Sequence, residues 1–157
     1  MKKFITLYWL NIALLFAIFY WELSPIADII NSLQTDLTTY LTAQTLEDEL
    51  MRGYEILINS HYSLVIEKAC NGLIPYLFFL ASIIAFPSTI IHKVKWALIG
   101  YILLTFINTF RIWLITQLVL SEVGNFSLAH DFVGNAMLIF TSLLLFILFV
   151  KSRYNSN

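Results

Sequence analysis

Charged residues are scarce in this chain of 157 residues, at 12% of the composition, whereas apolar residues make up 59%. Soluble domains average about 25% charged and about 45–50% apolar residues. This deficit of charge excludes an ordinary soluble domain, because a chain with so few charged residues could not cover its surface with groups that water solvates. The composition therefore predicts an integral membrane protein.

Cysteine is almost absent, since Cys70 is the single one, and this excludes an intramolecular disulfide framework. Three scattered histidines and one cysteine without a close pair argue against a zinc site. The chain also lacks a Gly-rich phosphate loop, an internal repeat and a low-complexity tract. We therefore expect neither a metal nor a cofactor.

Four apolar stretches approach the length needed to cross a hydrocarbon core of about 30 Å. The first follows Lys2 and Lys3 and lacks the small-residue cleavage site of a signal peptide, so we expect it to be retained. Pro75 suits the first turn of the second stretch, and Pro87 is expected to bend or end that helix. The predicted spans are residues 4–21, 73–91, 96–120 and 131–150.

The charges predict an orientation for these spans. If the N-terminus is cytoplasmic, the cytoplasmic segments carry only basic residues, and all ten acidic residues lie on or near the other side. We therefore expect one all-α membrane domain over residues 1–157, with four spans and both ends in the cytoplasm. The basic residues concerned are Lys2, Lys3, Lys93, Lys95, Lys151 and Arg153.

Residues 22–72 are expected to form an extracytoplasmic segment. Apolar residues first recur there at helical spacing, which predicts an amphipathic helix. Its polar face is acidic, so we expect the helix to pack on the protein's own outer face rather than on anionic lipid. Apolar residues then occupy every second position on either side of residues 59–61, which predicts a short β-hairpin that leads to Cys70. The apolar helix positions are Ile26, Ile29, Ile30, Leu33, Leu37, Tyr40 and Leu41.

Cys70 is the first candidate for covalent chemistry. It stands just before the span predicted at 73–91 and is followed by the small residue Gly72. Unpaired N–H groups at a helix start favour a thiolate. The alternative is that a lone cysteine in an apolar chain serves as a small buried hydrophobic residue.

The predicted topology brings further polar groups to the same side as Cys70. His130 precedes the fourth span there, although a helix-start residue meeting solvent is the alternative for this histidine. Arg111 lies fifteen residues beyond Trp96, about 22 Å along the third span, and therefore in the outer third of the core. Asn108 lies one turn below Arg111 on the same helix face.

An arginine inside a span costs about 2.5–3.5 kcal/mol on insertion scales, so Arg111 should face protein, water or a counter-charge. Snorkelling to the outer headgroups is the alternative. The acidic residues that could pair with Arg111 or His130 are Glu67, Glu122 and Asp131, and the sequence leaves the choice among them open.

Three short motifs resemble the signature of the exosortase/archaeosortase family in their order, spacing and common membrane face. The resemblance covers residues 54–150 and implies a membrane-embedded cysteine transpeptidase or protease. It implies Cys70 as the nucleophile, Arg111 as the third catalytic group and His130 as the proton-transfer partner, supported by Asn108, Asn71 and Gly72. The motifs are Ala69-Cys70-Asn71-Gly72-Leu73, Asn108-x-x-Arg111-Ile112 and His130-x-x-x-Gly134.

The resemblance also implies a substrate class and a location. Members act on exported proteins that end in a short motif, a transmembrane helix and a basic tail. We expect this chain in the bacterial cytoplasmic membrane, in contact with lipid, with its active site on the extracytoplasmic side and no nucleic-acid partner. It is shorter than many members and is similar to compact types such as exosortase H.

Two other classes of function remain open from the residues alone. A non-catalytic membrane scaffold or assembly protein would need only the helices and the acidic outer segment. A small transporter would use Asn108, Arg111 and Thr105 as a polar path, but charge concentrated at one surface gives no inner half for such a path.

Overall fold

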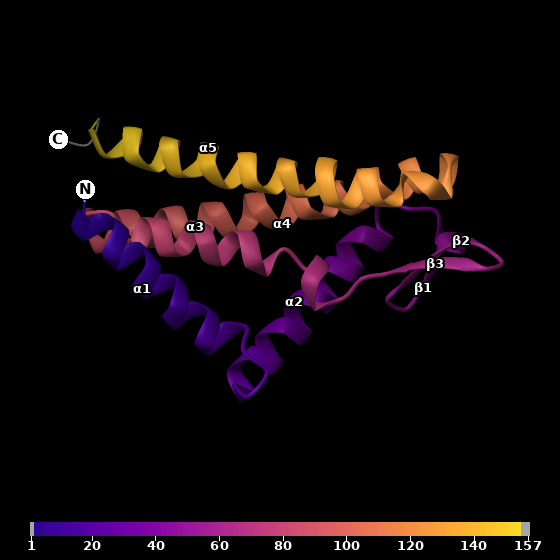
Figure 1. Ribbon diagram of the computed structural model, residues 1–157, viewed down its shortest axis with the longest axis horizontal. Coiled ribbons are helices and arrows are strands. Elements are labelled where there is room, and N and C mark those ends of the chain that lie inside the picture. The colour runs from indigo at the N-terminus through magenta and orange to yellow at the C-terminus, as the bar shows by residue number, and fades with distance from the viewer. Residues whose placement is uncertain (1, 155–157) are drawn as a thin grey trace.

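The computed structural model describes residues 2–154 and is mostly helical (Figure 1). A small antiparallel sheet, ordered β1-β2-β3, follows the second helix. The helices are α1 (Lys2–Phe19), α2 (Pro25–Ala43), α3 (Leu73–Ala85), α4 (Ile90–Ser121) and α5 (Asn135–Tyr154). The strands are β1 (Met51–Arg52), β2 (Glu55–Asn59) and β3 (Tyr62–Val65). Shorter helical turns cover Asp48–Leu50, Lys68–Cys70, Val123–Asn125 and Leu128–Gly134.

Helices α3, α4 and α5 pack against one another, and α1 packs on α3. Figure 1 shows both ends of the chain at one end of the molecule and the small sheet at the other. The start of α4 lies beside the end of α5, where His92 Nε2 is 3.2 Å from the Phe149 carbonyl oxygen. The basic residues Lys93 and Lys95, in the first turns of α4, are therefore at the same end as the termini.

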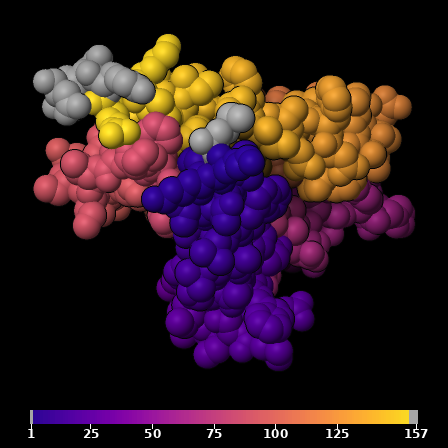
Figure 2. Space-filling model, turned by 60° about the vertical axis from the view of Figure 1, so that its left-hand side comes forward, coloured from indigo at the N-terminus to yellow at the C-terminus, as the bar shows by residue number. Residues whose placement is uncertain are grey.

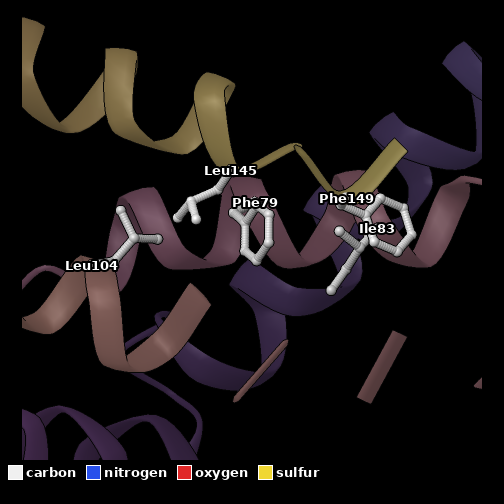
Figure 3. Packing of buried hydrophobic residues seen from close by; sticks show 5 residues of the cluster. All are labelled: Phe79, Ile83, Leu104, Leu145 and Phe149. Atoms are coloured by element: carbon white, nitrogen blue, oxygen red, sulfur yellow. The ribbon is translucent and has the colours of Figure 1, made fainter. Parts of the chain in front are cut away.

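A cluster of buried side chains joins α3, α4 and α5. Figure 3 shows these side chains facing one another from the three helices. In a bilayer, lipid tails are as apolar as these side chains, so close packing rather than water exclusion holds such helices together. The cluster comprises Phe79, Ile83, Leu104, Leu145 and Phe149.

Within residues 2–154, three helical stretches are long and apolar enough to cross a membrane, namely Lys2–Phe19, Ile90–Ser121 and Val123–Arg153. The span expected at 73–91 is shorter in the structure, because α3 ends at Ala85. Phe86 is extended, with φ −78° and ψ 136°, and its N–H bonds to the Ser82 carbonyl. The residue before a proline avoids the helical region, so Pro87 stops the helix.

The other helix bounds also differ from the expected ones. The span expected at 96–120 begins earlier, because the Thr89 side chain accepts a hydrogen bond from the His92 N–H and caps α4. The span expected at 131–150 is preceded by a π-helical segment, Leu128–Gly134, and continues to Tyr154. Arg111 lies 21 residues after Ile90, about 32 Å along α4.

The expected amphipathic helix is α2, and it packs on the protein, against α1 and α4. Its uncharged polar residues are buried there, whereas Asp28 and Asp36 are exposed and Ile29 and Leu33 are each 61% exposed. Three of the buried polar side chains donate to backbone carbonyls: Asn31 Nδ2 to Phe19 at 2.8 Å, and Gln34 Nε2 and Thr38 Oγ1 to Asn71. Figure 2 shows α1 and α2 as a column that projects from the later helices. The buried polar residues are Asn31, Gln34, Thr38 and Thr42.

The expected hairpin is present as β2 and β3, with the short strand β1 added. Its turn is stabilised by the Asn59 side chain, whose Oδ1 accepts from the His61 N–H at 2.9 Å. Ile56 packs with Ile112 of α4 and seats the sheet on that helix. The Tyr54 hydroxyl donates to Asp36 of α2 at 2.6 Å, and this hydrogen bond raises the pKa of Tyr54.

Candidate active site

The thiol and one imidazole meet in the folded chain. Cys70 ends the short turn Lys68–Cys70, where its N–H donates to the Glu67 carbonyl at 2.8 Å. His130 lies in the π-helical segment before α5, a rare conformation that is frequent at functional sites. The Sγ of Cys70 is 4.0 Å from His130 Nε2, although the two residues are 60 positions apart.

The second ring nitrogen of His130 has a carboxylate partner. Nδ1 lies 2.8 Å from Asp131 Oδ1, and Ser127 Oγ donates to the other Asp131 oxygen at 3.0 Å. The Phe126 ring stacks on the imidazole with centroids 5.2 Å apart. If Nδ1 carries the ring proton, its N–H donates a hydrogen bond to the carboxylate, and Nε2 is free to accept a hydrogen bond from the thiol. The sequence left open which of Glu67, Glu122 and Asp131 pairs with His130, and in the structure it is Asp131.

Arg111 is buried, with 3% of its surface exposed, and does not snorkel to the headgroups. Nη1 donates to Asn108 Oδ1 and Nη2 to Asn135 Oδ1, each at 3.4 Å, while Nε has no partner. Among residues 2–154 no carboxylate forms an ion pair with Arg111, and the one close contact between a carboxylate and a basic side chain joins Asp131 and His130. The guanidinium is thus a buried cation with spare donor capacity.

All three groups line a single cavity of about 340 Å³. Its walls come from β3, from the turn that carries Cys70, from the C-terminal third of α4 and from the π-helical segment. A second cleft continues from it, because Ala69 and Arg111 line both, and runs between α3 and α5. In the described part of the chain, no group of three or more His, Cys, Asp and Glu side chains is placed to hold a metal ion.

The turn that carries Cys70 is fixed by its neighbour Asn71, which is fully buried. The Asn71 carbonyl accepts from Gln34 Nε2 at 3.1 Å and from Thr38 Oγ1 at 3.2 Å. Its Nδ2 donates to Asn31 Oδ1 at 3.2 Å, and its Oδ1 accepts from the Leu73 N–H at 2.9 Å. The buried polar side chains of α2 therefore hold the turn that carries Cys70. The sequence shows that these polar residues share one helix face, but not that they contact Asn71.

Asn108 completes the support from α4. Its Nδ2 donates to the Cys70 carbonyl at 2.8 Å, while its Oδ1 accepts from Arg111. One amide thus connects the backbone beside the thiol to the guanidinium. Gly134 gives the guanidinium room, because a Cβ at this position would lie 2.6 Å from Arg111 Nε.

Replacing Gly72 by alanine is expected to destabilise the protein and displace Cys70. Gly72 has φ +79°, and an added Cβ would lie 2.9 Å from Asn108 Cγ. The positive φ alone costs about 1–2 kcal/mol for a residue with a Cβ. Gly53→Ala is the matched control, because Gly53 has φ +61° but nothing within 4 Å. Thermal unfolding in detergent and the iodoacetamide labelling rate of Cys70 should both change more for Gly72→Ala, and equal effects would contradict a tight contact with Asn108.

The fold and site together define a multi-pass helical membrane protein in which a lone thiol faces an imidazole beside a buried arginine. The family model described as transmembrane exosortase matches residues 2–147. The chain therefore belongs to the transmembrane exosortase family, as the motifs around Cys70, Arg111 and His130 predict. No curated protein and no solved structure matches the chain.

Proposed function

We propose that this protein is a cysteine transpeptidase or protease that cleaves the C-terminal sorting signals of exported proteins. The observation that carries the proposal is the 4.0 Å approach of Cys70 Sγ to His130 Nε2 in a cavity also lined by Arg111. Family membership supports a membrane transpeptidase for sorting signals. Catalytic hydrogen bonds are often long in enzymes without substrate and tighten in the complex, so a distance of 4.0 Å is compatible with this role.

In the proposed reaction, His130 Nε2 takes the thiol proton and Sγ forms a bond to the carbonyl carbon of the substrate. The carbonyl electron pair moves to oxygen, and the Arg111 guanidinium stabilises this oxyanion. His130 returns the proton to the leaving amine as the C–N bond breaks, which leaves a thioacyl group on Cys70. Water or a second amine then attacks the thioester and releases the new C-terminus. Asp131 keeps the imidazole oriented throughout.

The proposed topology places both ends of the chain in the cytoplasm and the site on the extracytoplasmic side of a bacterial cytoplasmic membrane. Its support is the common location of the termini and of the basic first turns of α4, which carry Lys93 and Lys95. Positive charge is retained on the cytoplasmic side of such membranes. In this arrangement α3 is the second of four crossings, and the turn that carries Cys70 completes it on the outer side.

The test is to co-express the protein with an exported protein of the same genome that ends in a short motif, an apolar span and several arginines. Mass spectrometry of the exported protein should find a new C-terminus near the motif. Neutral hydroxylamine should release acyl hydroxamate from the purified enzyme, since it cleaves thioesters. An uncut partner, with no hydroxylamine-sensitive adduct on Cys70 for any protein of this type, would contradict the proposal.

A further inference from the structure

We infer that the free edge of β3 binds the main chain of the substrate and places the scissile bond beside Cys70. This inference rests on the proposed function and identifies how the same site recognises a peptide. The occupant is the extended segment that precedes the apolar helix of the substrate. Main-chain pairing to an exposed strand edge is a general mode of peptide recognition.

The sheet leaves one edge of β3 unpaired. Its order is β1-β2-β3, so β3 contacts a strand on one side only. Ser63 pairs with Leu57 and Val65 with Glu55, while the Ile66 N–H donates to the Tyr54 carbonyl at 2.9 Å. In an antiparallel pair the bonded residues alternate with those whose N–H and C=O point away. The main-chain groups of Ser63 and Val65 therefore face the free edge.

This edge forms one wall of the cavity that holds the thiol. Residues 62–67 all line the cavity, without a gap, together with Cys70, Arg111 and His130. Successive side chains of a strand point to opposite faces, so a cavity over one face would be lined by every second residue. An uninterrupted run indicates that the cavity follows the strand edge.

The distance along the chain from this edge to the thiol is short and fixed. Ile66 is buried at 3% exposure and packs with Ile112 of α4. Glu67 is still extended, with φ −105° and ψ 176°, before the turn that ends at Cys70. A peptide paired with Ser63 and Val65 would thus run beside the chain that leads to Sγ. Burial of Ile66 also prevents the strand from slipping by one residue.

If the main chain of the substrate pairs with the edge of β3, a longer peptide should bind better than a shorter one even when both lack the side chains of the natural substrate. The test compares N-acetyl-trialanyl chloromethyl ketone with N-acetyl-alanyl chloromethyl ketone as labels of Cys70. In both, Sγ forms a thioether to the methylene carbon, chloride leaves with the bonding pair, and the thiol proton goes to His130. The trialanyl reagent should label the full-length protein in nanodiscs about five- to tenfold faster at limiting concentration, as expected for one or two net hydrogen bonds.

Val65→Pro removes one edge N–H and keeps the pairing with β2, because proline is tolerated where the N–H faces away from the sheet. Val65→Pro should bring the labelling rates of the trialanyl and alanyl reagents within twofold of each other. Val65→Ala keeps the N–H and should lose less of the preference for the trialanyl reagent. Asp48→Pro is the matched control in the same outer segment, at the first position of a short helical turn. It should keep the full preference. Iodoacetamide should label Cys70 equally in all variants.

Ser63→Pro provides a second variant in case Val65→Pro alters the iodoacetamide rate or the melting temperature. A trialanyl reagent that labels no faster than the alanyl reagent, or a preference that survives both prolines, would overturn the inference. A preference that falls as the protein-to-lipid ratio rises would assign the edge to a second copy of the chain and would also overturn it. Processing that persists in Cys70→Ala would instead contradict the proposed function, whatever the labels show.

Discussion

Cys70→Ala is expected to abolish processing of a sorting signal, with a loss of at least about 10³-fold in kcat. The change removes only Sγ, and it keeps the two backbone contacts of this residue, from its N–H to Glu67 and from Asn108 to its carbonyl. The turn should therefore stay in place while the thioacyl intermediate cannot form. Mass spectrometry of the exported substrate measures processing, and thermal unfolding measures the fold.

A control for the outer segment is His61→Ala, since His61 is exposed in the β2–β3 turn. This variant should process like the wild type and show that replacements in that segment do not by themselves stop the reaction. Wild-type processing by Cys70→Ala would remove the thiol from the mechanism. A non-catalytic assembly protein would then be the better interpretation of the chain.

Arg111→Lys is expected to lose activity almost as completely as Arg111→Ala, by about 10²- to 10³-fold in kcat, the effect of removing an oxyanion donor. The guanidinium reaches Asn108 and Asn135 with two different nitrogens and keeps Nε spare. A lysine ammonium is a point charge on a flexible stem and cannot reproduce this planar fork. Separate measurement of kcat and KM should show the loss mainly in kcat.

Replacing Arg111 by an uncharged residue should remove activity without lowering the stability of the fold. Arg111 is buried without a carboxylate partner among residues 2–154, so folding bears the cost of desolvating a cation. Arg111→Met is therefore expected to be inactive and to melt at the same temperature as the wild type or higher. Arg52→Met, at an exposed strand position, is the control for loss of one positive charge. A marked fall in the melting temperature for Arg111→Met would indicate a structural role instead.

The topology predicted that Cys70 and His130 lie on the same side, because each precedes a helix that starts there, but only the structure gives the 4.0 Å contact between them. The position of Arg111 followed from counting residues along its helix, on the face that it shares with Asn108. Its lack of an acidic partner could not be predicted, because Glu67, Glu122 and Asp131 are all near it in the topology.

The orientation of α2 shows why a periodic pattern is insufficient in a membrane protein. Periodicity identified the helix and its two faces, but it does not say which face meets the protein when lipid can solvate the apolar one. The deciding contacts are long-range, from Gln34 and Thr38 to the Asn71 carbonyl. No local signal in the sequence connects α2 to that carbonyl.

The shortness of α3 has a consequence for where hydrolysis or transfer can occur. Its 13 residues extend about 20 Å, whereas the hydrocarbon core is about 30 Å thick. In the proposed topology the turn that carries Cys70 completes the crossing, so the thiol lies at the outer boundary of the core. Bilayers built from shorter fatty acids match the length of α3 better, since proteins and membranes adjust to a difference in thickness at an energetic cost. In that topology the number of turns in α3 would couple the proposed activity to the thickness of the surrounding membrane.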